Sequence, residues 1–276
     1  MNIGIVGLGL IGGSLAKSAK KNTSFKVYGY DLNKDVIKKA VTEKSIDGEL
    51  TQKKLSVCDY VFIPLYPDAV IDYVSKNSDY FKEGAVVIDC AGVKRSVCDK
   101  CFEIADNSHF TFVGGHPMAG TQFSGFENSK DTMFYNAPFV LTPKENEDIL
   151  ILANAREVIM KLGFGRVSVM TPNKHDKLIA FTSQLAHVVS NAFVKSPSAL
   201  ERKGISAGSY KDLTRVAYLN ENMWTELFLD NKDNLIFELD NIINELQKYS
   251  DALKNNDSEF LKQLLKDGKE MKIKAD

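Results

Sequence analysis

The sequence lacks most of the features that would indicate a membrane, a nucleic acid or a disulfide-rich framework. The formal net charge of the 276 residues is −1, so there is no excess of basic residues to bind a nucleic acid or an anionic membrane. No apolar run reaches the roughly 18 residues of a membrane-spanning helix, and the chain begins with a strand-like segment rather than a signal peptide. We therefore expect a cytoplasmic protein whose length allows one large or two ordinary domains.

Cysteine is also scarce, and the four cysteines fit a reducing cytosol better than a set of disulfides. Cys98 and Cys101 have the local spacing of a metal-binding pair, but the sequence offers no second pair and no nearby histidine in a zinc pattern. Two thiols on adjacent turns of one helix are the simpler interpretation. No metal site is predicted.

The most informative segment is a glycine-rich turn near the N-terminus. The apolar run 3–6 is followed at once by Gly7-Leu8-Gly9-Leu10-Ile11-Gly12 and then by a helical pattern. A strand, a G-x-G-x-x-G turn and a helix in this order favour a dinucleotide-binding site. Gly7 would permit the tight turn, Gly9 would let the backbone approach a pyrophosphate, and Gly12 would let helix and strand pack closely. Since N–H groups at a helix start bind phosphates, the predicted cofactor contacts come from Gly7, Gly9, Leu10, Ile11 and Gly12.

An acidic residue follows the next predicted strand. Asp31 lies about 20 positions after the glycines, where a carboxylate binds the ribose hydroxyls of NAD and would repel the 2′-phosphate of NADP. No arginine follows directly, although Lys34 is nearby. A second interpretation is that Asp31 caps the helix beginning near Lys34, and both can hold. The sequence favours NAD over NADP.

The pattern of apolar residues changes near residue 170. Before it, strand-like runs alternate with helical stretches, which is typical of βαβ units and a parallel sheet. After Thr171-Pro172 the strand signals stop, and the pattern is helical to the end, with breaks only near 196–197 and 204–209. We predict an α/β fold with a Rossmann-type dinucleotide-binding domain at 1–170 and an all-helical domain at 171–276. The predicted strands are Asn2–Val6, Lys26–Tyr30, Tyr60–Leu65, Val86–Asp89, Thr111–Gly114, Phe139–Thr142 and Gly165–Met170.

Histidines that could carry chemistry are few, because the chain has four. His116 lies in a Gly/Pro-rich segment after a predicted strand, at the sheet edge where ligands bind in such folds. There it could take a proton from a hydroxyl as hydride leaves the carbon, or it could merely cap a turn. Ser183 and His187 are four residues apart and would project from one helix face, although His187 could also be a core histidine. His109 and His175 have no comparable setting and are predicted to lie on the surface.

Arg215 is the predicted anchor for an anion, because a guanidinium binds a carboxylate through two parallel hydrogen bonds. The alternative is an ion pair with Asp212, three residues earlier on the same helix. Trp224, the one tryptophan, could cover a planar ring, although packing in the core or at a dimer interface is commoner.

Four motifs occur in order along the chain: Gly7-x-Gly9-Leu10-Ile11-Gly12-Gly13-Ser14, Gly115-His116-Pro117-Met118-Ala119-Gly120, Ser183-Gln184-Leu185-x-His187 and Asp212-x-Thr214-Arg215-x-Ala217. Together they resemble the prephenate/arogenate dehydrogenase family, and the resemblance covers roughly residues 1–250. It implies a Rossmann-type domain and a helical domain that pairs two subunits into a homodimer, with the active site between the domains.

The resemblance also implies a reaction, the NAD-dependent oxidative decarboxylation of prephenate to 4-hydroxyphenylpyruvate in tyrosine synthesis. His116 would then contact the ring hydroxyl as acceptor or base, and Arg215 would bind a substrate carboxylate. Ser183 and His187 would orient the substrate. Loss of carbon dioxide makes the ring aromatic, so the substrate itself supplies much of the driving force.

The chain departs from the family pattern at three places. The family segment Gly-Ser-Val-Lys reads Ala91-Gly92-Val93-Lys94 here, so the serine that supports the histidine and the substrate is missing; Cys90 or a bound water could replace it. Ala186 replaces a proline, with little expected effect. Gln122, the remaining predicted substrate contact, stands where many members carry an acidic residue. A neutral amide attracts the ammonium of arogenate less than a carboxylate would, which favours prephenate over arogenate.

Two other functions stay open at this point. A β-hydroxyacid dehydrogenase shares the two-domain plan and the nicotinamide cofactor, and Lys174 or Lys177 could supply the lysine that such enzymes use, but the Ser/His face has no place in that scheme. A non-catalytic NAD-binding protein is conceivable because of Gly92, although the retained histidines and arginine argue against it.

Overall fold

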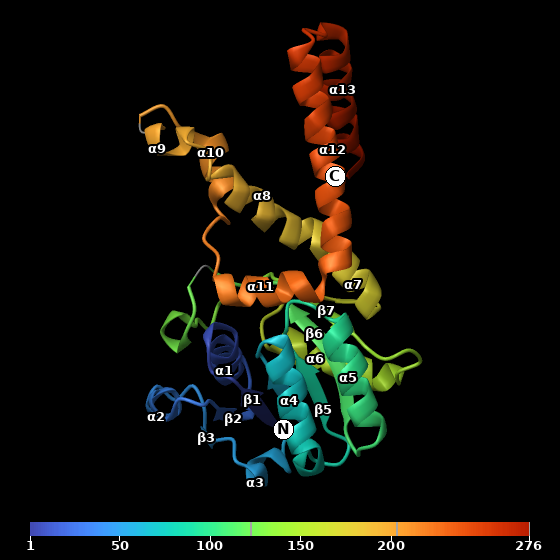
Figure 1. Ribbon diagram of the computed structural model, residues 1–276. Coiled ribbons are helices and arrows are strands. Elements are labelled where there is room, and N and C mark those ends of the chain that lie inside the picture. The colour runs from blue at the N-terminus through green and yellow to red at the C-terminus, as the bar shows by residue number, and fades with distance from the viewer. Residues whose placement is uncertain (122, 203, 276) are drawn as a thin grey trace.

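The computed structural model describes residues 1–121, 123–202 and 204–275. Its strands are β1 (Asn2–Val6), β2 (Lys26–Tyr30), β3 (Gly48–Glu49), β4 (Tyr60–Ile63), β5 (Val86–Asp89), β6 (Thr111–Pro117), β7 (Pro138–Thr142) and β8 (Arg166–Val169). Within the described residues they form one sheet in the order β3-β2-β1-β4-β5-β6-β7-β8 (Figure 1). Neighbouring strands are parallel except β6 and β7.

Apart from shifts of one or two residues at the ends of β4, β7 and β8, the sheet differs from the prediction in three places. β3 is absent from the predicted strands because an edge strand of two residues carries no apolar run. β6 continues past Gly114 to Pro117, since residues 114–117 pair with β7. A wholly parallel sheet is wrong at β7, because the described part of the β6–β7 connection contains only a short 3-10 turn, η2 (Phe126–Asn128), and no crossover helix. Without such a helix the chain returns antiparallel.

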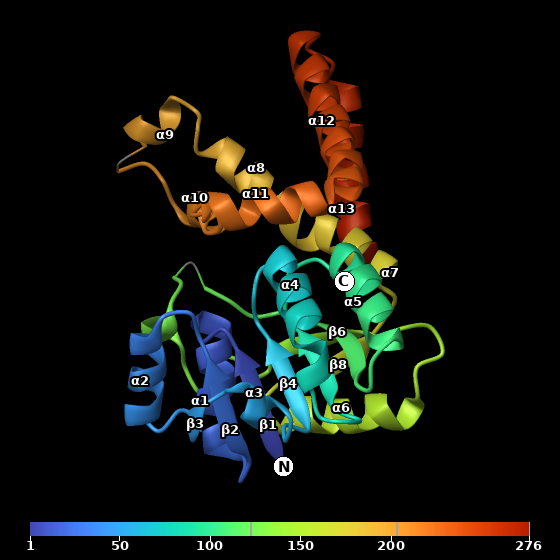
Figure 2. The same cartoon turned by 60° about the horizontal axis from the view of Figure 1, so that its bottom comes forward.

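Helices cover both faces of the sheet, which confirms the predicted Rossmann-type arrangement. Alternate strand residues face opposite sides, so in β4 the side chain of Phe62 packs into one core cluster and that of Ile63 into the other. One face is covered by α1 (Leu10–Asn22), α2 (Lys34–Thr42) and α6 (Ile149–Lys161), and the other by α3 (Gln52–Leu55), α4 (Pro67–Asn77) and α5 (Arg95–Asp106), with a 3-10 turn η1 (Ser78–Tyr80) after α4. Figure 2 shows α4 and α5 side by side over the second face.

The second part of the chain is helical, as predicted. Thr171 caps α7 (Pro172–Ile179), which continues through a π-helical turn, η3 (Ala180–Leu185), into α8 (Ala186–Phe193). The other helices are α9 (Ser198–Glu201), α10 (Gly208–Thr214), α11 (Glu221–Asp230), α12 (Lys232–Lys254) and α13 (Ser258–Ala275). In Figure 1 the α8–α10 segment and the α12–α13 hairpin project from the sheet in different directions. Among the helices described, none combines the length and apolarity needed to cross a membrane.

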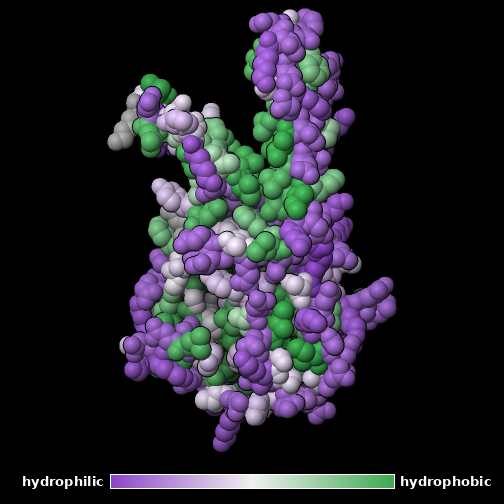
Figure 3. Space-filling view, in the orientation of Figure 1, coloured by the Kyte–Doolittle hydropathy of each residue, from purple (hydrophilic) through white to green (hydrophobic). Residues whose placement is uncertain are grey.

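Apolar side chains remain exposed on the helical part. Figure 3 shows hydrophobic residues gathered where α8 and α12 diverge. Exposed apolar residues of this region are Phe181, Phe193, Ile236, Phe237, Ile243 and Leu246. Contiguous apolar surface of this kind is typical of protein–protein contacts rather than of a free surface.

Candidate active site

The glycine turn after β1 leaves its backbone open to a ligand at Gly9. Gly7 has a φ of +94°, and its N–H donates to a carbonyl at the end of β2, at 2.7 Å. A Cβ on Gly12 would lie 1.8 Å from the Gly7 carbonyl oxygen, whereas none of the described atoms lies within 4 Å of a Cβ on Gly9. The turn is therefore tight on one side and open on the other. Gly9 is the N-cap of α1 and has no side chain to cap it, so the first N–H groups of α1 can bind a phosphate, including those of Leu10 and Ile11.

Asp31 is held at the end of β2 by two backbone donors. Its Oδ2 accepts the N–H of Leu8 and its Oδ1 that of Asn33, both at 2.9 Å. Asn33 rather than Asp31 caps α2, so the capping interpretation of Asp31 is wrong. Lys34, which could have favoured a 2′-phosphate, lies 2.5 Å from Glu49. The carboxylate of Asp31 thus remains the charged group beside the glycine turn.

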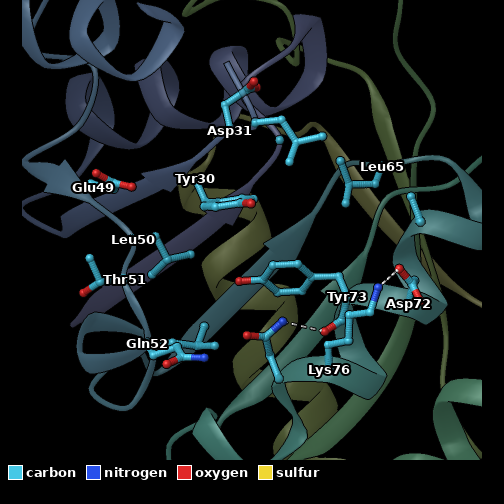
Figure 4. A pocket seen from close by; sticks show the side chains of 15 residues that line it. Tyr30, Asp31, Glu49, Leu50, Thr51, Gln52, Leu65, Asp72, Tyr73 and Lys76 are labelled. Atoms are coloured by element: carbon cyan, nitrogen blue, oxygen red, sulfur yellow. Dashed lines mark hydrogen bonds and ion pairs between the residues drawn. The ribbon is translucent and has the colours of Figure 1, made fainter. Parts of the chain in front are cut away.

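A cavity of about 570 Å³ lies beside this carboxylate, and its lining includes Gly7, Tyr30, Asp31, Leu65 and Tyr73 (Figure 4). The rings of Tyr30 and Tyr73 have centroids 6.0 Å apart. Of the three carboxylates that line it, Glu49 and Asp72 are paired with Lys34 and Lys76, whereas Asp31 has no ion-pair partner among the described residues. A volume of several hundred Å³ with apolar walls and a few polar groups is typical of a small-molecule site. The cavity is suited to the nucleoside end of a dinucleotide whose pyrophosphate lies on the glycine turn.

Asp31→Asn is expected to raise the Kd for NAD about tenfold and to reduce the preference for NAD over NADP. The change removes one charge-assisted acceptor, and hydrogen bonds to charged groups contribute about 1.5–3 kcal/mol. Titration of the protein with both cofactors measures this. Asp72→Asn is the matched control, because Asp72 also lines the cavity but is paired with Lys76 on α4. Equal effects of the two substitutions would contradict the assignment of Asp31.

His116 lies near the carboxyl end of β6, the same edge of the sheet as the glycine turn and Asp31. It is paired with Val140 of β7, so it belongs to a strand rather than to the predicted loop. The residue just before it, Gly115, is held through both of its backbone groups: Asp89 Oδ1 accepts its N–H at 3.0 Å, and Lys94 Nζ donates to its carbonyl at 2.7 Å. Asp89 and Lys94 form an ion pair with fully buried side chains. This ion pair therefore holds in place the backbone just before His116.

The predicted surface position of His175 is wrong. The residue is 1% exposed rather than on the surface. Its Nε2 lies 2.9 Å from His116 Nδ1, and its Nδ1 lies 2.7 Å from Asp176 Oδ1. The predicted surface position of His109 holds, since that residue is exposed. No local signal in the sequence identifies His175, because its partner His116 lies 59 positions away on another element.

The surroundings of the two contacting histidines lower the pKa of both. Burial lowers the pKa of His116 well below its ordinary value, and the neighbouring His175 and the Lys94 ammonium lower it further. Burial also lowers the pKa of His175, although the hydrogen bond to Asp176 opposes this. Both rings are therefore neutral near pH 7, and a neutral His116 can accept a proton.

His187 and Ser183 lie on the helix that continues from His175. His187 Nδ1 donates to the Ser183 carbonyl at 2.8 Å, which leaves Nε2 as a possible acceptor. The His187 ring lies 4.0 Å from that of Trp224, and Trp224 in turn lies 5.2 Å from Phe228. Trp224 thus covers the His187 ring within the same chain. Burial lowers the pKa of His187, and the charge of Arg215 contributes to the lowering.

Arg215 lies just after α10 and is exposed. Its charge acts on His187, which indicates that the two lie in one region. In the described part of the chain no carboxylate lies within ion-pair distance of Arg215, so the alternative pair with Asp212 is wrong. The structure thus forms one group around His116 and a second around His187 and Arg215, linked by the helix α7–η3–α8.

The structure shows what surrounds Gly92, where the family pattern has a serine. A Cβ on Gly92 would lie 3.3 Å from Leu227 of α11, so leucine packs where a serine side chain would begin. Burial raises the pKa of the Cys90 thiol, which stays protonated. The predicted substrate contact Gln122 lies outside the described residues.

Comparisons with known proteins cover both parts of the chain. A family model described as prephenate dehydrogenase, nucleotide-binding domain, matches residues 15–170, and one described as prephenate dehydrogenase, dimerization domain, matches residues 171–267. The prephenate dehydrogenase of Bacillus subtilis (strain 168) is 29% identical over 96% of this chain and 74% of its own length.

Two solved structures are similar over their full lengths. The crystal structure of prephenate dehydrogenase from A. aeolicus, in complex with hydroxyphenyl propionate and NAD+, is 31% identical, with a TM-score of 0.87 over 100% of this chain and 98% of that one. Synechocystis arogenate dehydrogenase is 27% identical, with a TM-score of 0.84 over 100% of both chains.

Proposed function

Because the chain belongs to the prephenate dehydrogenase family, we propose that it catalyses the NAD-dependent oxidative decarboxylation of prephenate to 4-hydroxyphenylpyruvate. The observation that carries the proposal is the position of His116, which is fixed through its Nδ1 near the carboxyl edge of the sheet, the same edge at which the glycine turn follows β1 and Asp31 follows β2. Ligands bind at this edge in open α/β sheets. The open face at Gly9 fits a pyrophosphate, and Asp31 fits the ribose of NAD.

The residues then have separate roles. When bound, NAD supplies the hydride acceptor for the ring carbon that carries the hydroxyl. His116 Nε2 accepts the hydroxyl proton as the carbonyl forms and returns it to the phenolate oxygen after the carboxylate leaves as carbon dioxide. Arg215 binds a substrate carboxylate, while Ser183 and His187 orient the substrate. No net proton is released, because the electrons of the broken carbon–carboxylate bond make the ring aromatic.

The assay that tests this proposal is NADH formation with prephenate and with arogenate, each with NAD and with NADP. We expect turnover of prephenate with NAD. Preference for arogenate would keep the reaction type but change the substrate, as in the Synechocystis relative. Absence of turnover with either substrate, with NAD still bound, would favour a non-catalytic NAD-binding protein. Turnover of 3-hydroxyacids alone would favour a β-hydroxyacid dehydrogenase.

Arg215→Gln is expected to raise the KM for prephenate at least tenfold, with a smaller change in kcat and no change in the Kd for NAD. A lost charge-assisted pair with a carboxylate costs about 1.5–3 kcal/mol, and each 1.4 kcal/mol is tenfold. Steady-state kinetics measure the effect. Arg156→Gln, which removes an exposed charge on α6, is the control. A KM within about twofold of wild type would contradict the assignment.

We further propose that the chain divides at 170/171 and forms a homodimer through the helical domain. β8 ends at Val169 and α7 begins at Pro172, which supports the division. The exposed apolar side chains of α8 and α12, in the part that matches a dimerization domain, support the dimer. Light scattering of the purified protein should then give twice the chain mass of 30.7 kDa. The four free cysteines support a cytoplasmic location.

A further inference from the structure

A buried hydrogen-bonded network connects the sheet to the helical part of the chain through His116, His175 and Asp176. We call these three residues the histidine–aspartate network. Its contacts are 2.9 Å between the two imidazoles and 2.7 Å between His175 and the carboxylate. The rings of His116 and His175 meet edge to face, at 63°. His175 and Asp176 are each at most 1% exposed, so water does not compete for these hydrogen bonds.

The carboxylate at the far end of the network is itself fixed. Asp176 Oδ1 accepts the N–H of Lys94 at 2.8 Å, and Oδ2 accepts the N–H of Arg95 at 2.9 Å. These donors lie at the start of α5, where a helix favours negative charge. The carbonyl of Asp176 accepts from Asn231 Nδ2 at 2.8 Å. With its carboxylate held by the start of α5 and its backbone carbonyl held by Asn231, Asp176 cannot follow the imidazole if the imidazole rotates.

The order of donors and acceptors follows from the carboxylate. Asp176 only accepts, so His175 Nδ1 carries the hydrogen. In a neutral His175, Nε2 then has the free lone pair and accepts from His116 Nδ1–H. A neutral His116 protonated at Nδ1 presents an unprotonated Nε2. This is the tautomer that can accept a hydroxyl proton, whereas the other tautomer would place an N–H against the substrate hydroxyl.

We propose that His175 and Asp176 are positioning residues that hold His116 in the tautomer whose Nε2 accepts the substrate proton. The proposal rests on the proposed function, since it assigns His116 the role of acceptor. It also accounts for Gly92: the support that a serine would give His116 comes instead from behind the ring, through His175. Neither residue touches the reacting atoms, and both act through His116.

The first experiment uses the unmodified protein. ¹⁵N NMR of the imidazoles at neutral pH should show His116 protonated at Nδ1 and unprotonated at Nε2, and His175 likewise. A His116 protonated at Nε2 would overturn the proposal without any variant. This result does not depend on turnover, so it separates failure of the network from failure of the proposed function.

The second experiment compares two substitutions of His175. His175→Leu removes the acceptor and should lower kcat about 100-fold, as for a misplaced catalytic group, while the KM for prephenate and the Kd for NAD stay within about twofold. His175→Gln places an amide oxygen near the position of Nε2, can accept from His116 Nδ1–H, and should recover most of kcat. His109→Gln, at an exposed histidine, is the matched control. If the Leu and Gln variants are equally stable to heat and lose kcat equally, the proposal is overturned. A His175 that serves only to pack against its neighbours would give that result. So would full activity of His175→Leu in an enzyme that His116→Asn inactivates.

Discussion

His116→Asn is expected to lower kcat for prephenate about a thousandfold, while the Kd for NAD stays near that of wild type. General acid–base catalysis by a positioned side chain contributes about 10²–10⁴ in rate. The asparagine amide nitrogen reaches about as far as Nδ1 of histidine, so it can still donate to His175 Nε2. The ring atom that faces away from His175 is lost. The substitution therefore removes the acceptor and leaves the buried network almost intact.

Steady-state kinetics and cofactor titration on the same preparation measure this split between kcat and cofactor binding. His109→Asn is the matched control, because His109 is exposed and contacts the Phe81 carbonyl away from the site. A kcat within about threefold of wild type would remove His116 from the reaction and, with it, the assignment of a base. A thousandfold loss accompanied by loss of NAD binding would instead indicate damage to the sheet edge.

Local patterns were sufficient to predict most of the fold. The glycine turn and the run before it contain all the information for β1 and the start of α1, because the geometry there depends on neighbouring residues. The change from strand to helix near Pro172 is likewise local. Family membership followed from motif order. What local pattern could not predict was β3, which is too short to have a pattern, and the direction of β7, which depends on the lack of a crossover helix in the described connection.

Contacts in the site are even harder to predict from local pattern. His116 was predicted from its own segment, but its partner His175 lies 59 positions away on another element. Such a contact exists only once α7 packs against the sheet edge, so no pattern near either histidine reveals it. The buried pair of Asp89 and Lys94 is similar: both appear in the sequence as ordinary charged residues, and only folding removes them from water.

Lys94→Met is expected to destabilise the protein by about 3–5 kcal/mol, the usual cost of removing one partner from a buried ion pair. Both side chains are fully buried. The substitution leaves the Asp89 carboxylate with only the N–H donors of Ala91 and Gly115, and leaves the Gly115 carbonyl without its Lys94 donor. The free energy of unfolding, from urea titration of the variant and wild type, measures the loss.

Lys82→Met is the matched control, because Lys82 forms an ion pair with Asp59 in which the side chains are 45% and 30% exposed. Exposed pairs contribute about 0–1 kcal/mol, so the two lysine substitutions should differ by several kcal/mol. Equal losses would mean that water reaches the Asp89–Lys94 pair. A large difference would also predict a lower kcat for Lys94→Met under conditions where the variant remains folded. Gly115, which precedes His116, then loses the hydrogen bond from Lys94 to its carbonyl.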